Sequence, residues 1–248
     1  MDIKELYKGH GSISIMIIGE SGRGKSTAIR NLPSESTFII NVMGKPLPFP
    51  GAFAKYKLGV NLAHIKSGPF IVEKMKEVSE KMPQIENLVI DDTQYIMATE
   101  FMEKVMVKGY DKFSIMAKNI WDIITTASLL RDGLKVYILC HEESNTDGGI
   151  TIRQMKTLGK LLREKISPEG LCTIVLFSEV SMTDQGPTYF FRTMSDGITT
   201  AKNPMGMFPM DIPNDLWLVS QRIDEYYSGV TLDTSKLDMV VRATGGRK

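Results

Sequence analysis

Cysteine is scarce in this sequence, which contains only Cys140 and Cys172. Each lies inside an apolar, strand-like run, so we expect two buried, reduced thiols rather than a disulfide framework. Long hydrophobic runs are also missing, because the run near the start, residues 13–18, is interrupted by Ser14 and is far too short to cross a bilayer. Residues 1–5 lack the apolar core of a signal peptide. These absences predict a cytoplasmic protein that does not bind a membrane.

An excess of charge of one sign is lacking as well, since 30 lysines and arginines face 29 aspartates and glutamates. The overall charge therefore does not favour nucleic acid, and any such contact would need a local patch or a mobile loop. The hydrophobic content of 42% is ordinary for a globular chain with a full core. There is no internal repeat and no low-complexity tract. We predict a single domain over residues 1–228, followed by a polar tail over residues 229–248.

Short apolar runs alternate with longer segments of helical spacing through about residue 180. This alternation is typical of a β-sheet covered by helices. The predicted strands cover residues 12–18, 37–42, 87–91, 135–140 and 171–180. The predicted helices, in which apolar residues recur at intervals of about three and four, cover residues 25–31, 69–81, 94–107, 112–130 and 155–166.

The region after residue 180 predicts an antiparallel addition to the sheet. Residues 184–187 are typical of a turn, and residues 188–193 and 197–202 can supply two antiparallel strands. A breaker-rich loop follows over residues 203–209, and Asn214 or Asp215 then caps a final helix through about Tyr227. The predicted fold class is therefore α/β, with a mostly parallel central sheet flanked by helices and an antiparallel C-terminal edge.

The most informative motif follows the first predicted strand and matches the pattern G-x-x-x-x-G-K-[ST]. It consists of Gly19, Glu20, Ser21, Gly22, Arg23, Gly24, Lys25 and Ser26. Between a strand and a helix, such a loop directs backbone N–H groups at an anion, and its glycines allow the tight wrap. Lys25 would lie between the β- and γ-phosphates, the Ser26 hydroxyl would bind Mg²⁺, and Thr27 would reach the α-phosphate. The alternative is a glycine-rich turn with an exposed lysine.

Two adjacent carboxylates end the apolar run of residues 87–91, in a pattern that resembles a Walker B motif. Asp91 directly ends the run and is the better Mg²⁺ partner, whereas Asp92 falls where many P-loop ATPases carry the acid that orients the attacking water. Either aspartate alone could equally be a solvated strand end or a helix cap. Together with the motif of residues 19–26, which is called a P-loop, the pair predicts an ATPase that binds ATP and Mg²⁺.

His141 follows the predicted strand over residues 135–140, at the carboxyl end of the sheet where ligands of open α/β folds bind. A polar side chain there could detect the γ-phosphate and pass its presence to the polar loop over residues 142–153. The alternative role for His141 is to cap the end of this strand. His141 is therefore the sensor candidate of the site.

The order of these parts resembles the RecA-like ATPase core, in which a P-loop strand and helix precede a Walker B strand, a sensor strand, a mobile loop and a terminal hairpin. Four segments resemble the bacteriophage core-only RecA-like ATPases more closely, namely GESGRGKS over residues 19–26, VIDDTQY over 89–95, KTLGKLL over 156–162 and AKNPMGMF over 201–208. That family is an AAA-type ATP-binding group linked to single-strand DNA annealing and recombination. The resemblance implies a RecA-like P-loop ATPase that binds single-stranded DNA during phage replication in the host cytoplasm.

The resemblance also implies a homo-oligomer with the nucleotide between subunits, where a basic residue of the neighbour completes the site. Lys202 occupies a place similar to the lysine of the K-x-R finger strand in DnaB-type helicases, although the second basic position is Pro204. Lys156 and Lys160 follow the loop that corresponds to a DNA-binding loop in RecA, so they are alternative trans-acting or DNA-contacting groups. Arg153, at the end of that loop, is a further DNA-contacting candidate. A solvated helix face is the alternative for both lysines.

One residue of the RecA-like pattern is absent. Such enzymes place a catalytic glutamate just after the strand that follows the P-loop helix, and residues 39–44 read IINVMG here. Hydrolysis would then be slow, or Asp92 would orient the water instead. Two other functions stay open: a small-molecule or nucleotide kinase, for which Arg153 and Arg163 give thin support as a lid, and an ATP-gated scaffold or loader of replication proteins.

Overall fold

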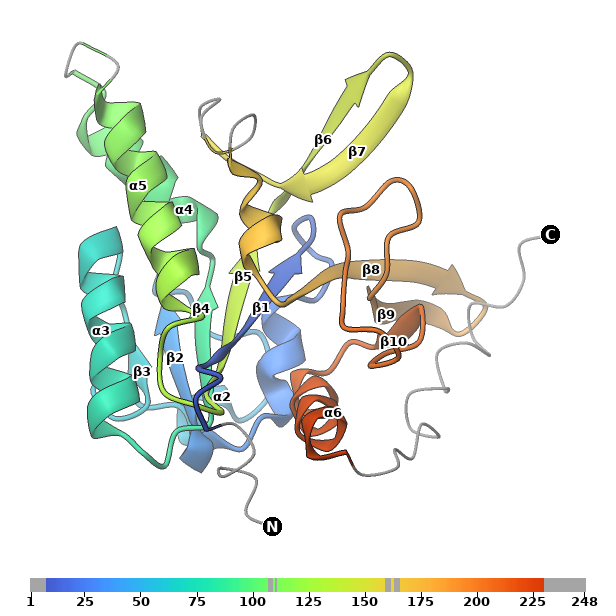
Figure 1. Cartoon of the computed structure of the whole chain (residues 1–248), viewed down its shortest axis with the longest axis horizontal. Coiled ribbons are helices and arrows are strands. Elements are labelled where there is room, and N and C mark those ends of the chain that lie inside the picture. The colour runs from blue at the N-terminus through green and yellow to red at the C-terminus, as the bar shows by residue number, and fades with distance from the viewer. Residues whose placement is uncertain (1–7, 107–108, 110, 159–161, 163–165, 230–248) are drawn as a thin grey trace.

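The structure is a computed structural model that describes residues 8–106, 109, 111–158, 162 and 166–229. A central eight-stranded sheet has the order β10-β9-β8-β1-β5-β4-β2-β3 (Figure 1). Its strands are β1 (Ile13–Ile18), β2 (Thr37–Asn41), β3 (Leu62–Ala63), β4 (Asn87–Asp91), β5 (Lys135–Cys140), β8 (Ile174–Thr183), β9 (Gly186–Arg192) and β10 (Asp211–Pro213).

The sheet is parallel from β8 to β3 and antiparallel at the β8-β9-β10 edge. This confirms the predicted fold class. The P-loop follows β1, Asp91 ends β4 and is followed by Asp92, and β5 lies between these two strands.

The last antiparallel strand is not the predicted one. Residues 197–202 form only isolated bridges, and β10 takes the edge position. The reason lies in Asp196, whose carboxylate accepts hydrogen bonds from the N–H groups of Ile198 (3.1 Å) and Thr199 (2.9 Å). Such local side-chain bonds offer the backbone an alternative to a strand ladder.

Helices cover both faces of the sheet (Figure 1). None of those that the structure describes is long and apolar enough to span a bilayer.

The helix predicted from residue 155 is wrong at its start, because Met155 ends a strand, and residues 159–161 and 163–165 lie outside the described part. The helical elements are η1 (Ser26–Asn31), η2 (Ser34–Ser36), α2 (Ala52–Lys55), α3 (Gly68–Lys81), α4 (Gln94–Glu103), α5 (Asp111–Thr126), η4 (Pro168–Leu171) and α6 (Leu216–Ser228).

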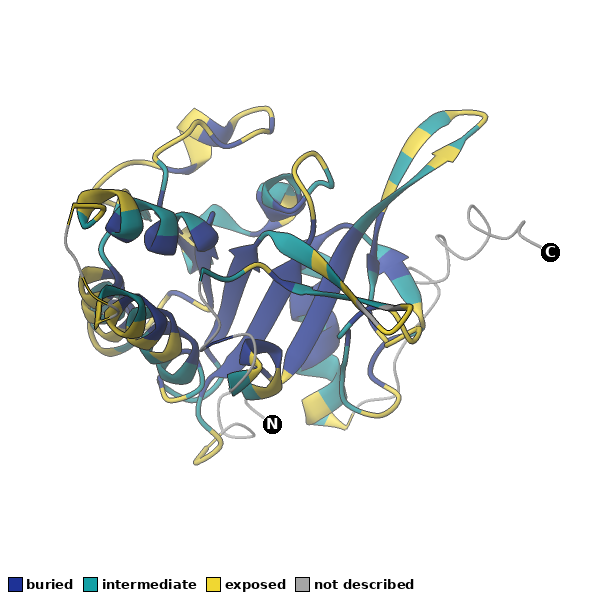
Figure 2. Ribbon diagram, turned by 90° about the horizontal axis from the view of Figure 1, so that it is seen from above, coloured by how far each residue is buried: buried dark blue, intermediate teal, exposed yellow. Residues whose placement is uncertain are grey.

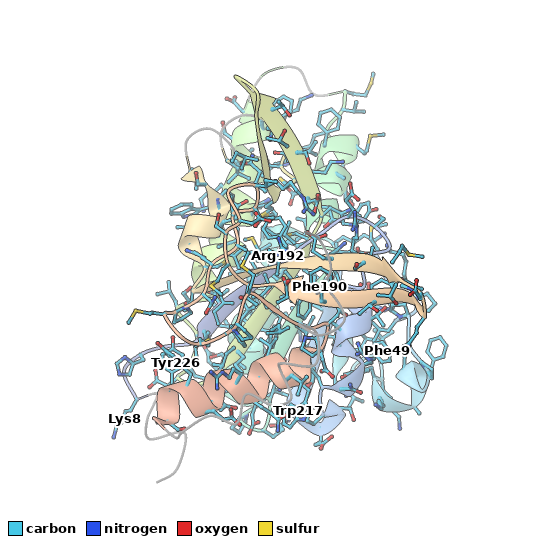
Figure 3. All side chains as sticks on the ribbon, turned by 90° about the vertical axis from the view of Figure 1, so that its right-hand side faces the viewer. Lys8, Phe49, Phe190, Arg192, Trp217 and Tyr226 are labelled. Atoms are coloured by element: carbon cyan, nitrogen blue, oxygen red, sulfur yellow. The ribbon has the colours of Figure 1, made fainter. Side chains whose placement is uncertain are left out.

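Two hydrophobic cores lie on opposite sides of the sheet, because successive side chains of a strand point to opposite faces. One core joins residues such as Met16 and Ile90 to α3, α4 and α5, and the other joins Ile17 and Val89 to η1, α2 and α6. Figure 2 shows the central strands buried throughout, which explains their continuous apolar runs. Along α6, Trp217 and Tyr226 pack against the second core (Figure 3).

Both cysteines are buried and neither forms a disulfide, as expected. Cys140 ends β5, and Cys172 lies just before β8. Burial raises the pKa of both thiols, so they are protonated at neutral pH. They are packing residues of the first core.

A separate two-stranded sheet, β6 (Glu142–Asp147) with β7 (Ile150–Met155), projects from the carboxyl end of β5 (Figure 1). The sequence predicted a mobile loop here. The structure shows a hairpin instead, because Gly148 and Gly149 both have positive φ, at 55° and 83°, as a two-residue hairpin turn requires. The Thr146 and Thr151 hydroxyls pair across the strands at 2.9 Å and support the same register.

Candidate nucleotide site

Residues 19–25 form a loop between β1 and η1 at the carboxyl end of the parallel strands. Two of its glycines are required by the structure. A Cβ atom on Gly19 would lie 2.8 Å from the Ser178 carbonyl oxygen, and Gly24 has φ 88° with Tyr189 only 3.1 Å from the place of its Cβ. The loop is thus held tightly against β8 and β9, with its backbone accessible from the other side.

The helix predicted over residues 25–31 is present at that place, but as the 3₁₀ helix η1. The Ala28 N–H donates to both the Gly24 carbonyl (3.0 Å) and the Lys25 carbonyl (3.2 Å), so the first turn is intermediate between the two helix types. Leu32 ends the helix in an extended conformation, which the following Pro33 favours. The short segment between loop and proline leaves no room for a longer helix.

Lys25 lies inside the loop and is only 7% exposed. Its ammonium donates to the carbonyl oxygens of Gly19 (2.7 Å) and Glu20 (2.8 Å). Burial lowers the pKa of Lys25, and the negative charges of Asp91 and Asp92 act in the opposite direction. An ammonium has three N–H donors, so one remains for an anion in the loop after these two contacts.

Ser26 and Asp91 meet although they come from different elements. The Ser26 hydroxyl donates to Asp91 Oδ1 at 2.9 Å. Burial raises the pKa of Asp91 to about 6, with a further contribution from the neighbouring Asp92 charge. A hydroxyl and a carboxylate are hard oxygen ligands of the kind that Mg²⁺ takes alongside water and phosphate oxygens. The described residues contain no cluster of three or more metal-binding side chains, so the pair would hold Mg²⁺ only together with phosphate and water.

Asp92 adopts a left-handed backbone conformation, with φ 64°, that is uncommon for a residue other than glycine. Its carboxylate forms an ion pair with Lys45, whose ammonium lies 2.6 Å from Asp92 Oδ2. The hydrogen bond to Asp92 raises the pKa of Lys45. No sequence motif marked Lys45, and the structure brings it to the predicted water-orienting acid.

His141, directly after β5, lies beside α4. Its backbone N–H donates to Gln94 Oε1 at 3.1 Å, and its ring packs edge to face on Tyr95 with the centroids 5.8 Å apart. Burial lowers the pKa of His141 to about 4, and the positive charge of Lys25 contributes. The imidazole is therefore neutral at neutral pH and can donate a hydrogen bond to an oxygen without adding charge.

One cavity of about 610 Å³ is lined by Lys25, Ser26, Asp92 and His141, whereas Asp91 lies behind Ser26 and does not line it. The cavity falls within the size range of small-molecule sites. The predicted site residues that line it are six from the segment 19–27, together with the second aspartate and the sensor candidate. The lining residues are Ser21, Gly22, Gly24, Lys25, Ser26, Thr27, Arg30, Lys45, Pro48, Asp92, His141, Tyr189 and Asn214.

Three further residues that line the cavity, Arg30, Tyr189 and Asn214, were marked by no sequence motif. Arg30 donates to the carbonyl oxygens of Thr27 (3.2 Å) and Asn214 (2.8 Å). Asn214 was one of two cap candidates for the last helix, but Asp215 is the cap, since it accepts the Trp217 N–H at 2.9 Å. Tyr189 adds a ring that is 41% exposed. These groups come together only through the order of the strands.

Two charged residues of the P-loop turn away from the cavity. Arg23 pairs with Glu20 (3.2 Å) and with Glu179 on β8 (3.4 Å). Glu179 also accepts from Arg153 at 2.5 Å, and Arg153 binds Glu142 at 2.7 Å. These ion pairs raise the pKa of Arg153, with the Glu142 hydrogen bond the largest cause. Arg153, predicted as a DNA contact, is thus held by two carboxylates of its own chain.

Lys156 and Lys202 do not line the cavity of their own chain. Lys156 is exposed just after β7. Lys202 forms a bridge to Val175 and donates from its ammonium to the Gly170 carbonyl at 3.2 Å. Lys160 lies outside the described residues. Their roles toward DNA or a neighbouring subunit stay predictions.

Comparison with known proteins adds little to this geometry. No protein-family model and no curated protein sequence matches the chain. Among solved structures, the chain is similar to a KaiC-like protein from the hyperthermophilic archaeon Pyrococcus horikoshii, with a TM-score of 0.46 and 12% sequence identity. The match covers 74% of this chain and 80% of that chain.

Proposed function

We propose that this protein binds ATP with Mg²⁺ in the P-loop cavity and hydrolyses it. The observation that carries the proposal is the contact between Ser26 and Asp91, 2.9 Å apart, next to the buried ammonium of Lys25. A hydroxyl, a carboxylate and an ammonium around a glycine-rich loop are the groups that hold a metal-bound triphosphate. When bound, Mg²⁺ would neutralise phosphate charge between its protein and water ligands.

The remaining groups fit the chemistry of hydrolysis. The water oxygen would bond to the γ-phosphorus while the bond to the β–γ bridging oxygen breaks, and ADP keeps that electron pair. The water proton passes to the released phosphate. Asp92 would orient the water, Lys25 would stabilise charge on the phosphate oxygens, and neutral His141 would donate to the γ-phosphate.

Other residues of the cavity suit the nucleoside. Arg30, Tyr189 and Asn214 also line it and would contact the sugar and base of a bound nucleotide. An exposed aromatic ring offers a face on which a base can stack. This supports a nucleotide as the ligand in preference to a free polyphosphate.

We further propose that the ATPase works as a homo-oligomer on single-stranded DNA, in annealing or recombination during phage replication. Support comes from the resemblance of the sequence to phage RecA-like ATPases and from the position of the β6–β7 hairpin, which begins directly after the sensor candidate His141. A ligand on the hairpin and a phosphate at His141 would then influence each other. Of the two lid candidates for a kinase, Arg153 is tied to Glu142 and Glu179, and Arg163 lies outside the described residues.

Steady-state ATP hydrolysis tests the proposal, measured with and without single-stranded DNA over a range of protein concentrations. DNA stimulation that rises cooperatively with concentration supports a DNA-dependent oligomer with shared sites. Hydrolysis that ignores both DNA and concentration supports the ATPase and contradicts the DNA role. A chain that binds no ATP contradicts the whole proposal.

A further inference from the structure

Lys45 lies on a turn that the end of β2 holds in place. Asn41, the last residue of β2, accepts the Gly44 N–H at 2.8 Å and donates its side-chain amide to the Lys45 carbonyl at 2.6 Å. Asn41 itself is only 3% exposed. The backbone of Lys45 is therefore fixed by a buried side chain, whereas the Lys45 side chain is 57% exposed.

The Lys45 ammonium contacts an acidic and an aromatic group at the cavity. It lies 2.6 Å from Asp92 Oδ2 and 5.1 Å from the centroid of the Tyr95 ring. Both Lys45 and Asp92 line the cavity, and so does His141. Because the Lys45 side chain is 57% exposed and its stem is flexible, the ammonium can leave Asp92 for another anion without a change in the buried core.

The other cations of the cavity are held by backbone carbonyls. Lys25 donates to Gly19 and Glu20, and Arg30 donates to Thr27 and Asn214. Among the side chains that line the cavity, Lys45 is the cation that is paired with a carboxylate. A triphosphate brings several negative charges, and that of the γ-phosphate increases during cleavage. A second cation near the γ-phosphate would stabilise that negative charge.

We propose that Lys45 recognises the γ-phosphate from within its own subunit, moving from Asp92 to the γ-phosphate when ATP binds. The inference rests on the proposed ATP site. The move leaves the Asp92 carboxylate to orient the attacking water, so a single displacement both detects the third phosphate and prepares hydrolysis. Lys45 follows the segment in which the expected catalytic glutamate is absent, and it supplies a cation without a neighbouring subunit.

The test compares full-length wild-type protein with Lys45→Ala, Lys45→Arg and the control Lys57→Ala, which removes an exposed lysine that does not line the cavity. ATP and ADP dissociation constants and the steady-state kcat are measured for each. We expect Lys45→Ala to weaken ATP by roughly tenfold and ADP by less than about twofold, and to lower kcat by roughly 10²-fold or more. Lys45→Arg should recover part of the preference for ATP, since it keeps the charge.

The outcomes separate this inference from the proposed function. Equal weakening of ATP and ADP by Lys45→Ala, or an unchanged kcat, overturns the role of Lys45 while the ATPase stands. A wild-type chain that binds ATP without hydrolysing it refutes the proposed turnover, and the ratio of ATP to ADP affinity still decides the role of Lys45. If the wild-type chain binds neither nucleotide, both proposals are wrong.

Discussion

Ser26 Oγ and Asp91 Oδ1 lie 2.9 Å apart, although 65 residues separate them in the chain. Ser26 is the last residue of the P-loop motif, and Asp91 ends β4, which is not a neighbour of β1 in the sheet. The two side chains meet because β1, β5 and β4 are adjacent parallel strands, so their carboxyl ends lie side by side. The hydroxyl and carboxylate of the proposed Mg²⁺ site are thus already adjacent in the folded chain.

Replacing Lys25 with alanine tests the phosphate end of the site. Hydrogen bonds to charged groups contribute about 1.5–3 kcal/mol, so ATP binding should weaken by roughly 10- to 100-fold. Titration calorimetry measures the affinity. Lys57→Ala is the matched control, since Lys57 is exposed outside the cavity. Equal affinities for wild type and Lys25→Ala would mean that the nucleotide does not use this loop.

Asp91 should destabilise the metal-free protein at neutral pH. Its pKa rises from 3.8 to about 6 in the fold, a change of roughly two units that corresponds to about 3 kcal/mol. Because the folded state holds the proton more tightly, this cost is absent below the unfolded pKa, grows as pH rises and is complete above the folded pKa. Asp91→Asn keeps an acceptor for Ser26 and removes the charge.

Thermal unfolding in chelator therefore measures the Asp91 effect directly. Asp91→Asn should be more stable than wild type at neutral pH, and the difference should disappear as pH falls through about 6 to 4. With Mg²⁺ and ATP added, the order should reverse, because the charged carboxylate then has a cation. A stability difference that is the same at every pH would show that the carboxylate charge is not its cause.

His141 should matter for turnover more than for binding. Its pKa of about 4 keeps the imidazole neutral, so in the proposed mechanism it would donate a hydrogen bond to the γ-phosphate. His141→Ala should lower kcat by at least about tenfold, and His141→Asn, which keeps a donor, should lower it less. Quenched-flow assays with saturating ATP separate this from affinity. Identical losses in both variants would favour the strand-cap role.

Sequence patterns identified the contiguous parts of the site and missed those assembled by the fold. The P-loop and the Asp91–Asp92 pair are short segments whose spacing reflects their chemistry. Lys45 and Tyr189 come from a loop and from β9, and only the strand order brings them to Lys25. No spacing of residues along the chain predicts that these three side chains line one cavity.

The sequence likewise does not show which charged residues form ion pairs in the fold. In the sequence, Arg153 ends a polar segment, where an arginine is typical of a phosphate contact. In the structure, the register of the β6–β7 hairpin places it beside Glu142. The third partner, Glu179, comes from β8. The two glycines at residues 148 and 149 indicated a flexible loop, although a hairpin turn requires the same residues.

Arg153 should therefore act on stability before it acts on DNA. Its partners are shielded, with side-chain exposures of 4% for Glu142 and 13% for Glu179. Arg153→Ala would leave both carboxylates without that partner, at a cost of about 2–4 kcal/mol in the free energy of unfolding. Lys156→Ala, which removes an exposed charge next to the same hairpin, should change stability by less than about 0.5 kcal/mol.

Denaturant unfolding and single-stranded DNA binding, measured on both variants, distinguish the two roles. If DNA binds at this hairpin, Lys156→Ala should weaken it and flatten its salt dependence while the fold is unchanged, since one phosphate contact is lost. Arg153→Ala that unfolds as late as wild type yet loses DNA affinity would mean that Arg153 leaves Glu142 and Glu179 to bind phosphate. The ion pairs of the free protein would then be a resting state of the DNA site.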